Sequence, residues 1–205
     1  MRTKYKPWAL PYLKEHSDIA YASFDSANLF YDDSLCIEIG GGKGDFILSL
    51  AKAHPNVHYL MIERVISVAA MASKKIVEEN ITNVRIIYDN FINIVGAMKN
   101  NSVNIIYLNF SDPWPKKKHK KRRLTADSFM NDYYRILKNK GLVILKTDQV
   151  SLYEFSKQNI NIEKFSIIID NPNYKNLADD DFMSEYERKF RTQNKNIYRL
   201  MVQKI

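Results

Sequence analysis

The sequence predicts an α/β fold in which strands and helices alternate around an open, mostly parallel sheet. Seven short apolar stretches have the composition of strands, helix-like stretches separate most of them, and polar clusters follow five of the strands. Strands that alternate with helices form βαβ units, which make neighbouring strands parallel. In such sheets ligands bind at the carboxyl ends of the strands, so the five polar clusters should share one edge.

The first half of the chain carries three strand-like stretches, each followed by a helical pattern. Phe46, Ile47, Leu50 and Ala51 recur at helical spacing after glycines that end the first strand. The expected elements are a strand at 35–39, a helix at 45–53, a strand at 58–63, a helix at 65–79, a strand at 84–88 and a short helix at 91–98.

The second half continues the alternation and ends on two strands. The expected elements are a strand at 103–110, a helix at 124–137, a strand at 141–146, a helix at 152–158 and strands at 166–169 and 198–202. Thr125 is a candidate cap for the helix at 124–137. With 205 residues, 45% of them hydrophobic, the chain is expected to form a single domain over 1–205.

Composition excludes several classes of protein. No apolar run approaches the roughly 20 residues of a membrane span. The basic start of the chain leads into no apolar signal core, which favours the cytoplasm. The single cysteine, Cys36, cannot form an internal disulfide, and the four histidines have no ligand spacing, so no metal site is expected.

Positive charge is concentrated in one run, Lys116–Arg123. Seven of its eight residues are basic, and without them the chain would have 24 basic against 23 acidic residues. Such a run suits a polyanion, although a solvated surface loop or a targeting signal would have the same composition. If the ligand is RNA, the residues expected to contact its backbone are Lys117, Lys118, Lys120, Lys121, Arg122 and Arg123.

A glycine-rich turn follows the first strand, from Glu38 to Gly44. Gly40, Gly42 and Gly44 allow positive φ angles and a close approach of backbone to ligand, although a flexible turn would look the same. The dinucleotide fingerprint is not met, because Asp45 stands where its last glycine belongs. Glu38 suits a ligand that carries an ammonium group, which favours S-adenosylmethionine over NAD.

Two further strand ends could complete an adenosine site. Glu63 could accept hydrogen bonds from both ribose hydroxyls, although it could equally pair with Arg64 or Lys74. Asp89 and Asn90 could bind the adenine amino group through a side-chain carbonyl, or could simply form a turn.

A proline-stiffened corner, Asp112-Pro113-Trp114-Pro115, ends the fourth strand beside the basic run. Trp114 could stack on a base or close the pocket, or its indole could pack inward.

Taken together, these motifs resemble the bacterial tRNA (guanine-N7)-methyltransferases over almost the whole chain. The matching stretches, in family order, are Lys6–Ala9, Glu38–Gly44, Ile62-Glu63, Tyr107–Lys117, Lys120–Leu124, Lys146-Thr147-Asp148 and Glu185–Phe190. The corner Asp112–Pro115 with the lysines that follow it is highly specific for this family, whereas the glycine loop is shared by many methyltransferases.

The resemblance implies a Rossmann-like class I methyltransferase fold, with a mostly parallel seven-stranded sheet and helices on both faces. It implies transfer of a methyl group from S-adenosylmethionine to guanine N7 in the tRNA variable loop. The implied cofactor contacts are Glu38, Gly40, Gly42, Gly44, Glu63, Asn90 and Asp112, and the implied substrate contacts are Lys116, Asp148, Ser184, Glu185, Tyr186 and Glu187. The family usually has Asp at position 90 and Thr at position 184.

Guanine N7 carries a lone pair and no proton, so the reaction needs no general base. Asp112 and Asp148 are the candidate catalytic residues, because carboxylates would stabilise the positive charge that develops on the guanine. The alternatives are an RNA methyltransferase for another base and an inactive RNA-binding relative. Monomer and homodimer stay open. Residues 1–30, rich in aromatic side chains, are expected to pack as an extension on or near the cofactor or RNA face.

Overall fold

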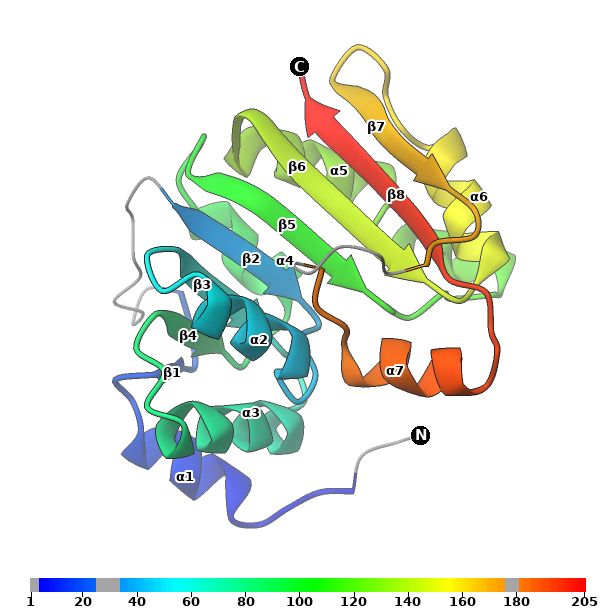
Figure 1. Ribbon diagram of the computed structural model, residues 1–205. Helices are drawn as coiled ribbons and strands as arrows, with labels where there is room; N and C mark the ends of the chain where they lie inside the picture. The colour runs from blue at the N-terminus through cyan, green and yellow to red at the C-terminus, as the bar shows by residue number, and fades with distance from the viewer. Residues whose placement is uncertain (1–3, 25–33, 176–180) are drawn as a thin grey trace. The chain divides into compact units, whose positions relative to one another are not determined.

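The computed structural model describes residues 4–24, 34–175 and 181–205 (Figure 1). Contacts divide the chain into two compact units, Met1–Met98 and Lys99–Ile205, and each is described by itself. The single domain expected over 1–205 stays a prediction.

The first unit contains a parallel sheet in the order β1-β4-β3-β2. Its strands are β1 (Ala20–Tyr21), β2 (Leu35–Ile39), β3 (His58–Ile62) and β4 (Val84–Ile87). Every residue of β2 is buried, as is typical of a parallel strand that is covered on both sides. The three strands predicted in this half are confirmed.

The helices of the first unit connect its strands as predicted. They are α1 (Ala9–Glu15), α2 (Asp45–Ala53), α3 (Ile66–Glu78), the short α4 (Phe91–Ile94) and the 3-10 turn η1 (Val95–Ala97). The apolar positions of α2, including Phe46, Ile47 and Leu50, are buried, which confirms the helical spacing seen in the sequence.

The described part of the N-terminal segment packs within the first unit, through a helix and a strand that were not predicted from the sequence. Helix α1 packs against α3, and β1 pairs with β4 as an additional strand. The backbone N–H of Lys6 donates to the hydroxyl of Ser67 at 3.0 Å, which ties the chain to the start of α3. Phe30, one of the aromatic residues of the predicted extension 1–30, lies outside the described residues.

The second unit contains a mixed sheet in the order β5-β6-β8-β7. Its strands are β5 (Val103–Asn109), β6 (Leu137–Thr147), β7 (Phe165–Asn171) and β8 (Tyr198–Lys204). Strands β5 and β6 are parallel, whereas β8 is antiparallel to both β6 and β7. The described residues thus form eight strands where seven were predicted, and β1 is the addition.

The helical segments of the second unit are η2 (Lys117–Arg122), α5 (Asp127–Ile136), α6 (Val150–Gln158) and α7 (Glu185–Thr192). The sequence analysis missed α7, and it was wrong about Thr125. Ala126 stands at the N-cap of α5, while the Thr125 hydroxyl shares a hydrogen bond of 2.7 Å with Ser156.

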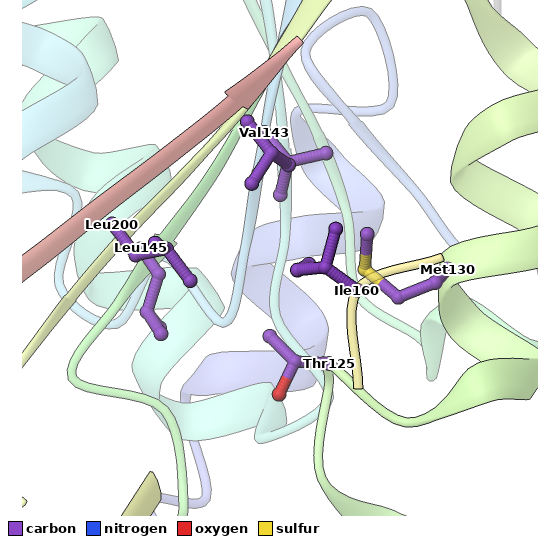
Figure 2. A pocket seen from close by; sticks show the side chains of 7 residues that line it. Thr125, Met130, Val143, Leu145, Ile160 and Leu200 are labelled. Carbon is purple, nitrogen blue, oxygen red and sulfur yellow. The ribbon is translucent and has the colours of Figure 1, made fainter. Parts of the chain in front are cut away.

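A small apolar cavity of about 10 Å³ lies beside the sheet of the second unit (Figure 2). Side chains of β6, β8, α5 and the segment after α6 surround it: Thr125, Met130, Val143, Leu145, Ile160, Leu200 and Val202. At about the size of one water molecule, it is a packing gap and too small for a cofactor.

Candidate cofactor and nucleic-acid sites

The glycine loop joins β2 to α2, and three of its residues adopt left-handed backbone angles. The φ angles of Gly40, Gly42 and Gly44 are 79°, 60° and 81°, which other residues adopt only with strain. A Cβ atom on Gly40 or Gly42 would meet no heavy atom within 4 Å, so backbone is accessible from that side. A Cβ on Gly41 would lie 2.3 Å from the Met61 side chain. The loop is therefore packed on one side and open on the other.

Glu63 follows β3 and binds the glycine loop directly. Its Oε2 accepts a hydrogen bond of 3.0 Å from the backbone N–H of Gly42, and its Oε1 accepts one of 2.8 Å from Val65. The side chain is almost fully buried. These bonds fix the carboxylate beside the loop.

Glu38 and Asn90 follow the neighbouring strands of the same sheet. Glu38, at the end of β2, is only 2% exposed. Asn90 is exposed, and its Oδ1 accepts from the N–H of Ile92 at 3.4 Å as the N-cap of α4. Because β2, β3 and β4 are adjacent and parallel, Glu38, Glu63 and Asn90 do share one edge of this sheet, as predicted. The role of Asn90 toward adenine stays a prediction.

The Asp-Pro-Trp-Pro corner follows β5, and hydrogen bonds from Arg123 hold it in place. The guanidinium donates to the carbonyl oxygens of Pro113 at 2.9 Å and Trp114 at 3.3 Å. Arg123 is 3% exposed, and this burial lowers its pKa from the ordinary value. Its guanidinium is buried against the corner, and the predicted contact of Arg123 with the RNA backbone stays a prediction.

The rest of the basic run forms the exposed turn η2. Lys117, Lys118, Lys120, Lys121 and Arg122 are exposed, as is Lys116 just before it. The Arg122 guanidinium lies 5.0 Å from the centre of the Trp114 ring, and the His119 ring meets the same indole edge-on. Trp114 therefore has a basic neighbour on its face, and the phosphate contacts of the exposed residues stay a prediction.

Asp148 follows β6, the parallel neighbour of β5, so Asp112 and Asp148 end adjacent strands. Its Oδ2 accepts from Gln149 Nε2 at 2.7 Å and from Lys195 Nζ at 3.3 Å. The Lys195 ammonium also lies 4.3 Å from the centre of the Phe190 ring. These contacts fix the carboxylate in a nearly buried position at the carboxyl edge of the sheet.

The Ser184–Glu187 segment begins α7 and divides into exposed and buried residues. The Ser184 hydroxyl caps the helix by accepting from the N–H of Glu187 at 3.1 Å. Glu185 and Tyr186 are exposed. Glu187 is fully buried and accepts from Lys146 at 3.2 Å and from Arg191 at 2.6 Å. The Glu187 carboxylate thus binds partners inside the protein, and its predicted substrate contact stays a prediction.

Lys146 was missed as a residue of this region, although one signal was present in the sequence. It follows Leu142-Val143-Ile144-Leu145 without a break, and charged residues are almost never fully buried unless they are paired. Its partner Asp181 carried no signal, since the two lie 35 positions apart.

Two absences hold for the residues that the structure describes. Residues 4–24, 34–175 and 181–205 contain no group of three or more His, Cys, Asp or Glu placed to hold a metal ion. Within the same ranges, no helix is long and apolar enough to cross a membrane.

Known proteins are similar in sequence to this chain over most of its length. The family described as "Putative methyltransferase" matches residues 32–200. A tRNA (guanine-N(7)-)-methyltransferase of Oceanobacillus iheyensis is 40% identical over 97% of both chains, and one of Staphylococcus haemolyticus is 38% identical over 98% of this chain and 96% of the relative. The chain belongs to the family of the tRNA (guanine-N(7)-)-methyltransferases. The resemblance seen in the sequence is thus confirmed.

Solved structures agree on the fold of this family member. An rRNA methylase of Streptococcus thermophilus has a TM-score of 0.58 at 12% identity, covering 100% of this chain and 99% of the other. A Streptococcus mutans methyltransferase in complex with SAH has a TM-score of 0.58 at 11% identity, with 99% and 100% coverage. At such low identity the likeness establishes the Rossmann-like methyltransferase fold alone.

Proposed function

We propose that the protein transfers a methyl group from S-adenosylmethionine to N7 of a guanine in the variable loop of tRNA. The observation that carries the proposal is the near-full-length match, at 36–40% identity, to relatives that are named tRNA (guanine-N(7)-)-methyltransferases. S-adenosylmethionine supplies a methyl group on a positively charged sulfur, and guanine N7 accepts it without losing a proton.

The residues of the first unit fit this cofactor. The open side of the glycine loop offers backbone to the methionine part, and the Glu38 carboxylate suits its ammonium group. Glu63 is held beside the loop by Gly42 and Val65, and its carboxylate would accept hydrogen bonds from the ribose hydroxyls. Asn90 would meet the adenine. The cofactor contact proposed for Asp112, a residue of the second unit, rests on the family resemblance alone.

The residues of the second unit provide the proposed substrate contacts. Asp148, held by Gln149 and Lys195, would accept hydrogen bonds from N1 or the amino group of the guanine. Lys116, Ser184 and the exposed residues Glu185 and Tyr186 would bind the same nucleotide. The exposed lysines and Arg122 of η2 would neutralise phosphates and hold the RNA in register.

Catalysis would then rest on position and charge. The guanine becomes positively charged as N7 is methylated, so the carboxylates of Asp112 and Asp148 would stabilise the transition state more than the ground state. The rest of the rate enhancement would come from holding guanine N7 in line with the methyl group of the cofactor. The proposal places the protein in the cytoplasm, where tRNA is used, and is independent of whether it acts as a monomer or a homodimer.

The test is methyl transfer from labelled S-adenosylmethionine to an unmodified tRNA transcript. Nuclease digestion and mass spectrometry would locate the product, and a transcript with adenine at the variable-loop guanine is the control. The expected result is 7-methylguanosine on the first transcript and none on the second. Methylation at another position would favour an RNA methyltransferase for a different base, and cofactor binding without transfer would favour an inactive RNA-binding relative.

A further inference from the structure

A buried ammonium group, that of Lys146, lies near the carboxyl end of β6, two residues before Asp148. Lys146 is 2% exposed, and its Nζ lies 2.6 Å from Asp181 Oδ1 and 3.2 Å from Glu187 Oε2. The same atom donates to the carbonyl oxygen of Phe182 at 3.4 Å. A buried charge is tolerated only when it is paired and hydrogen-bonded, so Lys146 requires these partners to stay in place.

The two carboxylates extend the network to other elements of the second unit. Asp181 Oδ2 lies 3.4 Å from the guanidinium of Arg199 on β8, and Glu187 Oε1 lies 2.6 Å from that of Arg191 on α7. The ring of Tyr174 has the cationic groups of Lys146, Arg199 and Arg191 within 5.2, 4.8 and 5.6 Å of its centre. The network therefore joins β6, β8 and α7.

The partners of Lys146 flank the segment that begins α7. Asp181 and Phe182 precede Ser184, and Glu187 closes the first turn of the helix. The Ser184 hydroxyl and the Glu187 N–H connect the two ends of this turn. A residue on β6 thus holds both ends of the segment whose exposed members are Glu185 and Tyr186.

We propose that Lys146 is a positioning residue that, through Asp181 and Glu187, holds the first turn of α7 in the geometry that binds the substrate nucleotide. The inference rests on the proposed function and assigns to Glu187 an internal role in place of substrate contact. Because Lys146 lies near the end of β6 and Asp148 directly follows this strand, the same strand end sets the position of both substrate-binding groups.

The test compares Lys146→Met with a matched variant, Lys204→Met. Lys204 is also a buried lysine of this unit, bonded to Asn101 and to the Leu137 carbonyl, and it lies at the opposite end of β8 from Arg199. Three readouts are measured: KM and kcat for tRNA, the affinity for S-adenosylmethionine, and hydrogen exchange of the backbone amides at 185–192.

For Lys146→Met we expect a KM for tRNA raised about tenfold or more, because misplaced binding groups lose affinity and orientation. Exchange at 185–192 should accelerate, while cofactor affinity stays within about twofold, since the proposed cofactor residues are elsewhere. Lys146→Arg, which keeps the charge, should recover part of the protection. Lys204→Met should lower the free energy of unfolding, but it should change neither the KM for tRNA nor the exchange at 185–192.

Two results would overturn the proposal: equal KM and equal exchange at 185–192 in the two methionine variants, or a raised KM without faster exchange. If Lys146→Met does not fold, Lys146→Gln takes its place, because an amide keeps a donor for one carboxylate, and the same comparison applies to it. A wild-type chain that methylates no tRNA would instead refute the proposed function, while the exchange comparison would still decide whether Lys146 holds α7.

Discussion

Replacement of Arg123 by methionine should destabilise the corner that ends β5. The guanidinium donates to the Pro113 carbonyl at 2.9 Å and to the Trp114 carbonyl at 3.3 Å, and it lies 4.5 Å from the centre of the Phe155 ring. Methionine keeps much of the apolar stem but has no donor. The corner would lose both hydrogen bonds that Arg123 donates to it.

The expected loss can be worked out from these contacts. A hydrogen bond that involves a charged group contributes about 1.5–3 kcal/mol. The bond to Pro113 should approach that range, the longer one to Trp114 should contribute less, and the ring contact adds up to about 1 kcal/mol. We therefore expect the free energy of unfolding to fall by about 2–4 kcal/mol.

The assay pairs denaturant unfolding with the salt dependence of tRNA binding, and the control is Lys121→Met in the same basic run. Lys121 is exposed, so its loss should change stability by no more than about 0.5 kcal/mol. If it contacts a phosphate, the slope of log K against log salt should become shallower by about 1. Arg123→Met should leave that slope unchanged, since its guanidinium is buried.

The opposite pattern would refute this reasoning. An Arg123→Met variant with wild-type stability and a shallower salt slope would mean that Arg123 faces the RNA, as the composition of the run alone suggested.

Three smaller changes test other contacts. Gly41→Ala places a Cβ 2.3 Å from the Met61 side chain and should lower the free energy of unfolding by about 1–3 kcal/mol. An unchanged unfolding midpoint would show that the loop and Met61 can shift without cost. Hydrogen bonding from Lys157 lowers the pKa of Asp170, so this carboxylate stabilises the fold above its ordinary pKa and the stabilisation disappears as the pH falls through the lowered value. Unfolding midpoints measured between about pH 6 and pH 2 should therefore fall less steeply in Asp170→Asn, and parallel curves would contradict this. Ser184→Ala removes the N-cap of α7 and should cost about 1 kcal/mol, which Ser184→Asp should largely restore because aspartate can also cap.

Local pattern was sufficient for most of the fold. The apolar stretch 35–39 could only be a buried strand, and the spacing of Phe46, Ile47 and Leu50 only a helix packed on one face. The shared position of the polar residues at the strand ends could also be predicted, because parallel strands place their carboxyl ends along one edge of the sheet. Glu38 and Glu63 occupy that edge in the first unit.

Elements with little local signal were missed. Strand β1 has two residues, which exist as a strand only because β4 offers free backbone beside them. Helix α7 is mostly charged, and its first turn is stabilised by a partner on β6 that lies 41 positions away. Periodicity cannot reveal either element, since the stabilising contacts come from distant parts of the chain.

The amino-acid sequence by itself determined the strand–helix alternation, the glycine loop, the run of positive charge and the family. All of these depend on residue type and short spacing. Only the tertiary structure decided which charges face water: Lys121 is exposed, whereas Arg123 holds a turn and Glu187 pairs with Lys146 inside the protein. The physical reason is that the cost of burying a charge depends on partners that only folding brings within hydrogen-bond distance.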